Sequence, residues 1–238
     1  MRVRVGSAVV SAAGCLFCLV RTAAAGPGDT VLYFSGVDLW RNGAFLHGGV
    51  VWSPWGLDNA GFSLKATVSG GDYNYISGAL GGAQVQGREL KAEFLPGWRF
   101  KWDKSELKVF AGVDLQNHQL SPDDPGSKLR GKDAGLRVAF DFWTEPTPLT
   151  MFAADGSVST IVSSYSARAA YGWRAFGRFY TGPEVQAFAS ENYSQQRVGL
   201  HITSLKLWNL EWSAATGYAR DSDRRGSAYV RLGIATKR

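Results

Sequence analysis

Three histidines, His47, His118 and His201, are the side chains best suited to proton transfer near neutral pH in this sequence. With a serine nucleophile and an orienting acid, a histidine could support lipid hydrolysis or acyl transfer. His118 precedes an acidic stretch at Asp123 and Asp124, whereas the other two lie among glycine and small residues. The sequence contains no G-x-S-x-G motif, and a hydrogen-bonded or solvated histidine is commoner than a catalytic one. We therefore expect no catalytic residue.

Two carboxylates, Glu89 and Glu93, could form the acid pair that hydrolyses glycosidic bonds. Lys91 lies between them, two residues from each, and could form salt bridges with both. The pair is therefore weak evidence for an enzyme. The sequence has no His/Cys cluster with metal-ligand spacing, so it predicts neither a metal nor a cofactor.

These carboxylates belong to a stretch, Glu89 to Trp102, in which polar and apolar residues alternate. Leu95 and Gly97 are the exceptions on the polar phase. A period of two indicates an extended strand with one apolar and one polar face. At about 14 residues the strand is long for a globular sheet, but tilted by about 45° it spans a bilayer.

The same alternation recurs along the chain and predicts about 12 strands. The longest connection runs from Gln119 to Gly131, and Asn42-Gly43 indicates a tight turn. Gly70-Gly71 suggests a bulge at which the phase switches, which would place Tyr73 and Tyr75 on the apolar face. The pairs Pro96-Gly97 and Gly182-Pro183 suggest further bulges.

Charge is confined to one phase in the centre of every predicted strand. A lipid-facing surface requires this, because a basic side chain near the midplane costs about 2 to 4 kcal/mol. Aromatic residues lie near the apolar strand ends, where a membrane-interface girdle would be: Trp52, Trp102, Phe142, Trp173, Trp208 and Tyr218. We expect an all-β, antiparallel, up-and-down transmembrane β-barrel in the outer membrane. A soluble periplasmic β-barrel binding protein, with its apolar phase inward, is the alternative.

The first 25 residues have the features of a cleaved secretory signal peptide. Arg2 and Arg4 precede an apolar run, and alanines before Gly26 offer a cleavage site. The expected division is a signal peptide at 1–25 and a barrel domain at 26–238. Removal takes both cysteines and lowers the net charge from +6 to +3, because 1–25 holds three arginines and no acid. So small an excess argues against a nucleic-acid partner.

The charged residues of the polar phase are candidates for lining the lumen of this barrel. Such groups could brace the interior as ion pairs, or they could contact a neutral glucan together with Tyr180, Phe188 and Tyr229. A 12-stranded lumen would be narrow or plugged. The candidates are Glu89, Lys91, Glu93, Arg99, Asp114, Arg137, Asp141, Arg168, Arg174, Glu184, Arg197, Glu211 and Arg231.

The longest predicted loop is the candidate surface for a protein partner. Its residues Asp123, Asp124, Lys128 and Arg130 could donate or accept hydrogen bonds. The simpler interpretation is a solvated loop that its prolines make rigid.

Several blocks of sequence together resemble one family, over residues 32 to 238. They are Phe34-Ser-Gly-Val-Asp-Leu-Trp-Arg-Asn-Gly-Ala-Phe-Leu-His-Gly49, Leu95-Pro-Gly-Trp-Arg-Phe-Lys101, Leu120-Ser-Pro-Asp-Asp-Pro-Gly126, Ser164-Tyr-Ser-Ala-Arg168 and Gly182-Pro-Glu-Val-Gln-Ala187. This pattern is similar to the cellulose biosynthesis protein family BcsS of alphaproteobacteria. The resemblance implies an outer-membrane accessory protein of cellulose synthesis or export, but no catalytic set.

Together, the residues and the resemblance predict a non-catalytic outer-membrane accessory protein that acts as a narrow pore or a scaffold. Its expected partners are outer-membrane lipid, the cellulose or glucan chain, and other subunits of the cellulose synthase complex. An outer-membrane enzyme that modifies lipid or polysaccharide is the second alternative.

Overall fold

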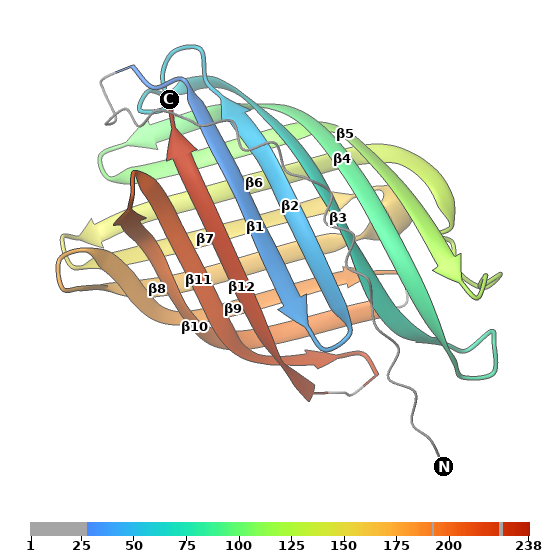
Figure 1. Cartoon of the computed structure of the whole chain (residues 1–238). Coiled ribbons are helices and arrows are strands. Elements are labelled where there is room, and N and C mark those ends of the chain that lie inside the picture. The colour runs from blue at the N-terminus through green and yellow to red at the C-terminus, as the bar shows by residue number, and fades with distance from the viewer. Residues whose placement is uncertain (1–27, 192, 224–225) are drawn as a thin grey trace.

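A computed structural model describes residues 28–191, 193–223 and 226–238; the expected signal peptide at 1–25 lies outside them. Twelve strands form a closed antiparallel barrel in which each strand pairs with its neighbours in sequence and β1 pairs with β12 (Figure 1). The strands are β1 Val31–Trp40, β2 Gly43–Trp52, β3 Gly61–Ser77, β4 Ala83–Trp102, β5 Ser105–Ser121, β6 Gly131–Thr147, β7 Thr150–Ser159, β8 Tyr165–Ala175, β9 Phe179–Ser190, β10 Tyr193–Leu207, β11 Leu210–Asp221 and β12 Gly226–Lys237. The predicted barrel fold is confirmed.

Helix is nearly absent from the described residues. A single 3-10 turn, Ile161–Ser163, follows β7. Within the part of the chain that the structure describes, no helix is long and apolar enough to cross a membrane.

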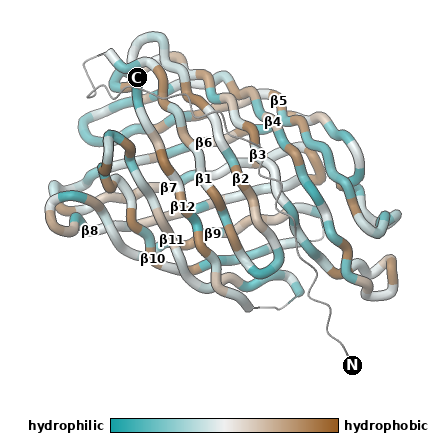
Figure 2. Tube along the Cα trace, viewed as in Figure 1, coloured by the Kyte–Doolittle hydropathy of each residue, from teal (hydrophilic) through white to brown (hydrophobic). Residues whose placement is uncertain are grey.

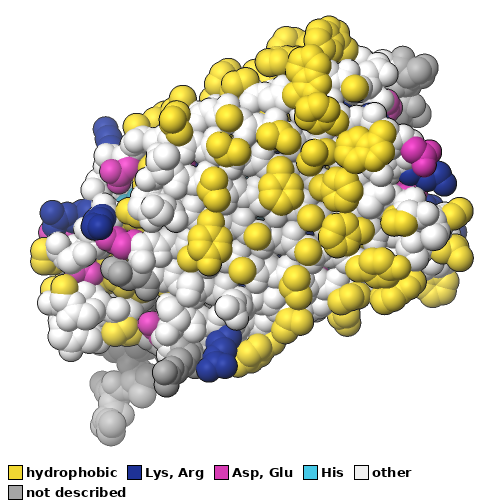
Figure 3. Space-filling view, turned by 180° about the vertical axis from the view of Figure 1, so that it is seen from behind, with side chains coloured by type: hydrophobic (Ala, Val, Ile, Leu, Met, Phe, Trp, Pro, Cys, Tyr) yellow, Lys and Arg dark blue, Asp and Glu magenta, His cyan; other side chains and the backbone are white. Residues whose placement is uncertain are grey.

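The outer wall of the barrel is apolar around its whole circumference. Leu46 on β2, Leu136 on β6 and Leu200 on β10 are 63–65% exposed, although they lie on well-separated strands. Hydrophobic and hydrophilic residues alternate along the strands (Figure 2). On the face that Figure 3 shows, apolar side chains form a broad band and charged ones gather toward the ends of the barrel. Soluble proteins rarely expose so large an apolar surface. The apolar residues of the alternating pattern therefore point outward and not into a core.

The two ends of the barrel differ. The end that carries the start of β1 and the end of β12 is here called the terminal end, and it has two-residue turns at 103–104, 148–149 and 208–209. The opposite end, here called the loop end, has the longest connection, 122–130. Trp52, Trp102 and Trp173 lie exposed near the terminal end, as a girdle of aromatic residues requires.

The bulge expected at Gly70-Gly71 is wrong. Both glycines pair in unbroken register, Gly70 with Leu46 and Leu90, and Gly71 with Phe45 and Glu89. Without an extra residue the phase cannot switch. Consequently Tyr73 and Tyr75 point into the barrel and not toward lipid.

The bulges expected at the two prolines are wrong as well. The β3–β4 register continues through Pro96, and the β9–β10 register continues through Pro183. On the other side of each proline the ladder loses two pairs and then resumes without a shift. The observed shifts lie between Thr144 and Thr147 and between Ile202 and Leu205, close to the terminal end. Each proline therefore interrupts hydrogen bonding to one neighbour without adding a residue.

Candidate functional site

Ion pairs cross the interior of the barrel between strands that are not neighbours. Lys65 on β3 binds Asp141 on β6 at 3.3 Å, across two intervening strands. Arg231 on β12 binds Glu184 on β9, and Arg197 on β10 binds Asp38 on β1 at 2.8 Å. Contacts of this kind can form only through the lumen, so these side chains point inward.

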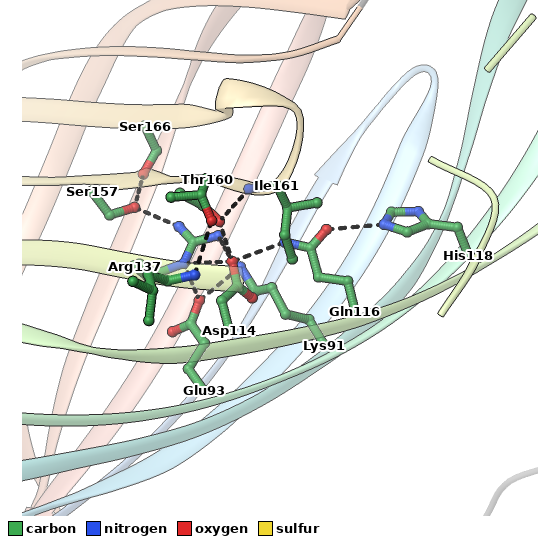
Figure 4. A network of polar contacts seen from close by, with 12 residues as sticks. Lys91, Glu93, Asp114, Gln116, His118, Arg137, Ser157, Thr160, Ile161 and Ser166 are labelled. Carbon is green, nitrogen blue, oxygen red and sulfur yellow. Dashed lines mark hydrogen bonds and ion pairs between the residues drawn. The ribbon is translucent and has the colours of Figure 1, made fainter. Parts of the chain in front are cut away.

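Arg137 is the centre of the largest network (Figure 4). Its guanidinium donates to Asp114 at 2.7 Å and lies 3.0 Å from Glu93. Asp114 is fully buried and also accepts hydrogen bonds from Ser159 at 2.6 Å and Gln116 at 3.0 Å. Because unpaired buried charge is expensive, these donors stabilise the carboxylate in the interior.

Glu184 is the centre of a second network on the other side of the lumen. Its carboxylate binds Arg168 at 3.1 Å and Arg231 at 2.5 Å, and it accepts a hydrogen bond from Tyr229. Arg168 also binds Asp155 at 2.8 Å. The interior therefore holds charges of both signs that compensate one another.

Two cavities lie inside the barrel, one at each end, and they share no lining residue. The loop-end cavity is about 340 Å³ and the terminal-end cavity about 550 Å³. Between them, some inner residues of β4, β5, β6 and β9 line neither cavity. They include Glu93, Leu95, Phe110, Asp114, Ala139, Asp141 and Glu184. These residues, with their cationic partners Lys65, Arg137, Arg168 and Arg231, are here called the central belt; it lies between the two cavities, and Arg137 also lines the loop-end one.

The loop-end cavity is rich in aromatic side chains and balanced in charge. Its formal charges are two acidic and two basic: Asp38, Glu89, Lys91 and Arg137. Its aromatic lining comprises Trp40, Phe45, Tyr73, Tyr75, Tyr165, Phe188 and Tyr193. Apolar ring faces beside neutral polar groups suit an uncharged polar ligand.

The terminal-end cavity has a different character. Its lining includes six basic residues and three acidic ones: Arg99, Lys108, Arg174, Arg178, Lys206 and Lys237 against Glu106, Glu145 and Glu211. Arg99 donates to the backbone carbonyl of Leu57, and Arg174 binds the Tyr180 hydroxyl and Glu145. The two ends of the lumen are therefore chemically distinct.

The structure distributes the predicted lumen residues among these three regions. Lys91 binds Glu93 at 3.0 Å, beneath the loop-end cavity, and Glu211 accepts a hydrogen bond from Ser204 in the terminal-end cavity. Glu89 lines the loop-end cavity and, among the described residues, makes no ion pair or hydrogen bond. The other ten are in the contacts given above. Most of these charges brace the barrel, and Glu89 is available to a ligand.

The loop 122–130 folds over the mouth of the loop-end cavity. Asp124 is buried and accepts a hydrogen bond from Tyr75 at 2.8 Å. The backbone N–H of Lys128 donates to the Glu191 carboxylate at 2.8 Å. Arg130 and Asp123 form an exposed pair with each other at 3.1 Å. Of the four candidate loop residues, Asp124 is thus internal, whereas Asp123, Lys128 and Arg130 are at the surface.

A hydrogen-bonded environment surrounds two of the histidines. The two ring nitrogens of His118 bind the Tyr73 hydroxyl and the Gln116 side chain, both at 3.1 Å. His201 lies 3.2 Å from the backbone carbonyl of Tyr171. In the described residues neither imidazole is hydrogen-bonded to a serine, and no group of three or more potential metal ligands occurs.

Sequence reasoning missed most of the aromatic residues of the loop-end cavity. Of the aromatics expected to contact glucan, only Phe188 lines that cavity, because Tyr229 is buried in the Glu184 network and Tyr180 lies at the terminal end. Tyr73 and Tyr75 were assigned to the outer face by the false phase switch. Unbroken counting by twos from Lys65 through Ser69 would have placed both inside.

Comparisons with known proteins agree on architecture at low identity. The KdgM porin is 11% identical with a TM-score of 0.49, over 86% of this chain and 98% of that chain. A Pseudomonas aeruginosa FadL homologue is 11% identical with a TM-score of 0.41, over 87% of this chain and 74% of that chain. Such values carry no argument about function. No curated protein matches the sequence. The family described as cellulose biosynthesis protein BcsS matches residues 32–238, so the chain belongs to that family.

Proposed function

We propose that this chain is a non-catalytic outer-membrane component of the bacterial cellulose biosynthesis apparatus. The apolar band around the whole barrel carries the proposal, because exposed residues such as Leu46, Leu136 and Leu200 match a surface made for lipid. The family supplies the process. The start of β1 and the end of β12 lie at the terminal end and the longest connection, 122–130, lies at the loop end, which favours placing the terminal end in the periplasm and the loop end outside.

A closed scaffold fits the lumen better than an open pore does. The central belt separates the two cavities, and Lys65–Asp141 and Arg231–Glu184 tie opposite parts of the wall together. Glu184 is fully buried, and leaving a buried carboxylate without its cation costs about 3 to 5 kcal/mol, which opposes opening of the belt. We infer that the protein holds or organises components of cellulose export and does not itself conduct them.

The histidine contacts support a role without catalysis. The His118 ring is held between Tyr73 and Gln116, an arrangement that positions the side chains of a cavity wall. Partners in this proposal are outer-membrane lipid, the glucan chain and further subunits of the cellulose synthase complex. The exposed loop residues Asp123, Lys128 and Arg130 provide the surface for a subunit.

Fractionation together with gel migration tests the location. The expected result is recovery with the outer membrane and faster migration before boiling than after it, as a folded barrel shows. A chain recovered soluble from the periplasm and insensitive to boiling would refute the proposal and favour the soluble barrel.

Conductance in planar bilayers tests the closed lumen. We expect no steady channel from the unmodified chain. The double variant Lys65→Ser, Asp141→Ser, which removes one crossing ion pair, should show brief openings. Steady conductance of the unmodified protein would contradict a closed belt and restore the pore.

A further inference from the structure

An aromatic strip lines one wall of the loop-end cavity, across three adjacent strands. Trp40 on β1, Phe45 on β2 and Tyr73 and Tyr75 on β3 follow one another, and the planes of successive rings differ by 8°, 20° and 23°. Their centroids are 5.6, 6.4 and 6.2 Å apart. All four rings line the cavity. The four ring planes are therefore close to parallel, and together they form a continuous aromatic wall.

Glycines on the neighbouring strands make this flat arrangement possible. A Cβ on Gly43 would come within 2.4–2.8 Å of three atoms of the Trp40 ring, and one on Gly87 within 2.2–2.7 Å of three atoms of the Tyr73 ring. Similar distances to several atoms of one ring mean that the ring lies face down on the glycine. A Cβ on Gly71 would come within 2.6–2.8 Å of the Phe45 backbone and the first carbon of its ring. The Tyr73 ring therefore turns its other face toward the cavity, whereas the Arg197 guanidinium lies over the Trp40 ring, 4.9 Å from its centroid.

Polar groups are held beside the strip. Tyr73 binds His118, which binds Gln116, which in turn donates to the buried Asp114 of the central belt. This chain of hydrogen bonds fixes the strip to the belt. Figure 4 shows its part from His118 through Gln116 to Asp114. Glu89 pairs in register with His118, and its carboxylate makes no ion pair or hydrogen bond among the described residues. A fixed polar edge and an unengaged acceptor therefore lie next to the apolar surface.

This combination selects the class of ligand. The formal charges of the cavity cancel, so it does not favour an anion or a cation. A sugar ring of an equatorially linked glucan has C–H groups on its faces and hydroxyls around its rim, and it is flat enough to lie on an aromatic ring. Hydroxyls donate well to a carboxylate such as Glu89 and to neutral side chains such as Gln116.

We propose that the loop-end cavity binds a short segment of neutral β-linked glucan, with its sugar faces on the Phe45, Tyr73 and Tyr75 rings of the strip. The choice of a glucan rests on the proposed function, and the geometry of the site supplies the rest. At about 340 Å³ the cavity lies at the small end of ligand sites, and the central belt forms its floor. The segment therefore enters from the loop end and stops there, without threading the barrel.

Calorimetric titration of the full-length, detergent-purified protein with cellohexaose tests the site. Binding should be weakened about tenfold by Phe45→Ala and by Tyr73→Ala, which corresponds to about 1.4 kcal/mol for one lost stacking surface. The matched control is Phe179→Ala, which removes an aromatic ring from the terminal-end cavity and should leave the affinity unchanged. Heat-modifiable migration of each variant verifies that it is folded.

Glu89→Gln tests the site without removing an aromatic ring from the cavity wall. It keeps the size of the side chain, removes the charge and should weaken cellohexaose binding several-fold. A protein that does not bind cellohexaose, or binds it equally well in all strip variants, would overturn the assignment. Preferential binding of oligogalacturonate, an anionic oligosaccharide, would overturn the neutral class.

These results separate the site from the proposed function. An outer-membrane protein that fails to bind cellohexaose refutes only the glucan site. A protein that binds it through the strip but is soluble in the periplasm refutes only the membrane proposal.

Discussion

The substitution Leu200→Arg tests whether the apolar band faces lipid. Leu200 lies on the outer wall at the middle of β10, seven residues from each end, and is 63% exposed. At a rise of about 3.3 Å per residue and a tilt of about 45°, Leu200 lies about 16 Å along the membrane normal from each end of the strand. The apolar band of a barrel extends about 12 Å to either side of the midplane. Because both strand ends lie beyond the band, Leu200 lies near the midplane.

The expected loss of stability follows from that depth. Arginine at the midplane destabilises a barrel by about 2 to 4 kcal/mol, or about thirty- to a thousandfold in the folding equilibrium. The control is Gln196→Arg, on the same face of the same strand and four residues closer to the loop end. At about 9 Å from the midplane it approaches the interface, where the cost falls to about 0 to 1 kcal/mol.

Urea unfolding from lipid vesicles, followed by tryptophan fluorescence, measures both variants. We expect a clearly lower urea midpoint for Leu200→Arg. The midpoint of Gln196→Arg should be almost unchanged. If this outer wall faced water and not lipid, both positions would be solvated and neither change would matter. Equal, small effects would therefore refute the lipid-facing assignment.

Two further predictions concern the interior and the loop. Arg137→Met should destabilise the barrel by about 3 to 5 kcal/mol, because Asp114 would be left buried without its cation; adding Asp114→Asn should recover part of the loss in the same urea assay. Hydrogen bonds from Ser77, Tyr75 and the Gly126 N–H lower the pKa of Asp124, against desolvation that raises it. This contribution is present at neutral pH and is lost as the pH falls through the lowered pKa, below about pH 4. A spin label attached at Pro125→Cys should become mobile below about pH 4. In an Asp124→Asn background it should already be mobile at pH 7. Equal mobility of the label at pH 7 and below pH 4 in the unsubstituted background would show that the Asp124 carboxylate does not hold the loop.

The barrel was predictable because the constraint that shapes it acts on every strand. Charge on the outer wall is expensive in lipid, so residues such as Glu93 and Arg137 hold one phase while Phe94 and Phe140 hold the other. The Asn42-Gly43 dipeptide is in addition a local sequence signal for a tight hairpin turn. Alternation and turns thus sufficed for the number and direction of the strands and for the facing of most residues, with Tyr73 and Tyr75 as exceptions.

The binding cavity was not predictable in the same way. Which charges pair depends on strands far apart in sequence, as Arg197 and Asp38 show, and no local pattern encodes that distance. The strip depends on register, because Phe45 lies on Gly71 only after β2 and β3 have aligned. Glycine pairs were interpreted as bulges, whereas here a glycine makes room for a ring on the next strand.

The closure that we propose for the lumen bears on how many copies a cell can carry. An open channel dissipates gradients and admits toxic solutes in proportion to its abundance. A barrel closed by bridges such as Lys65–Asp141 and Arg231–Glu184 would add no such leak. Such a protein could be packed densely around an export apparatus without making the envelope leaky.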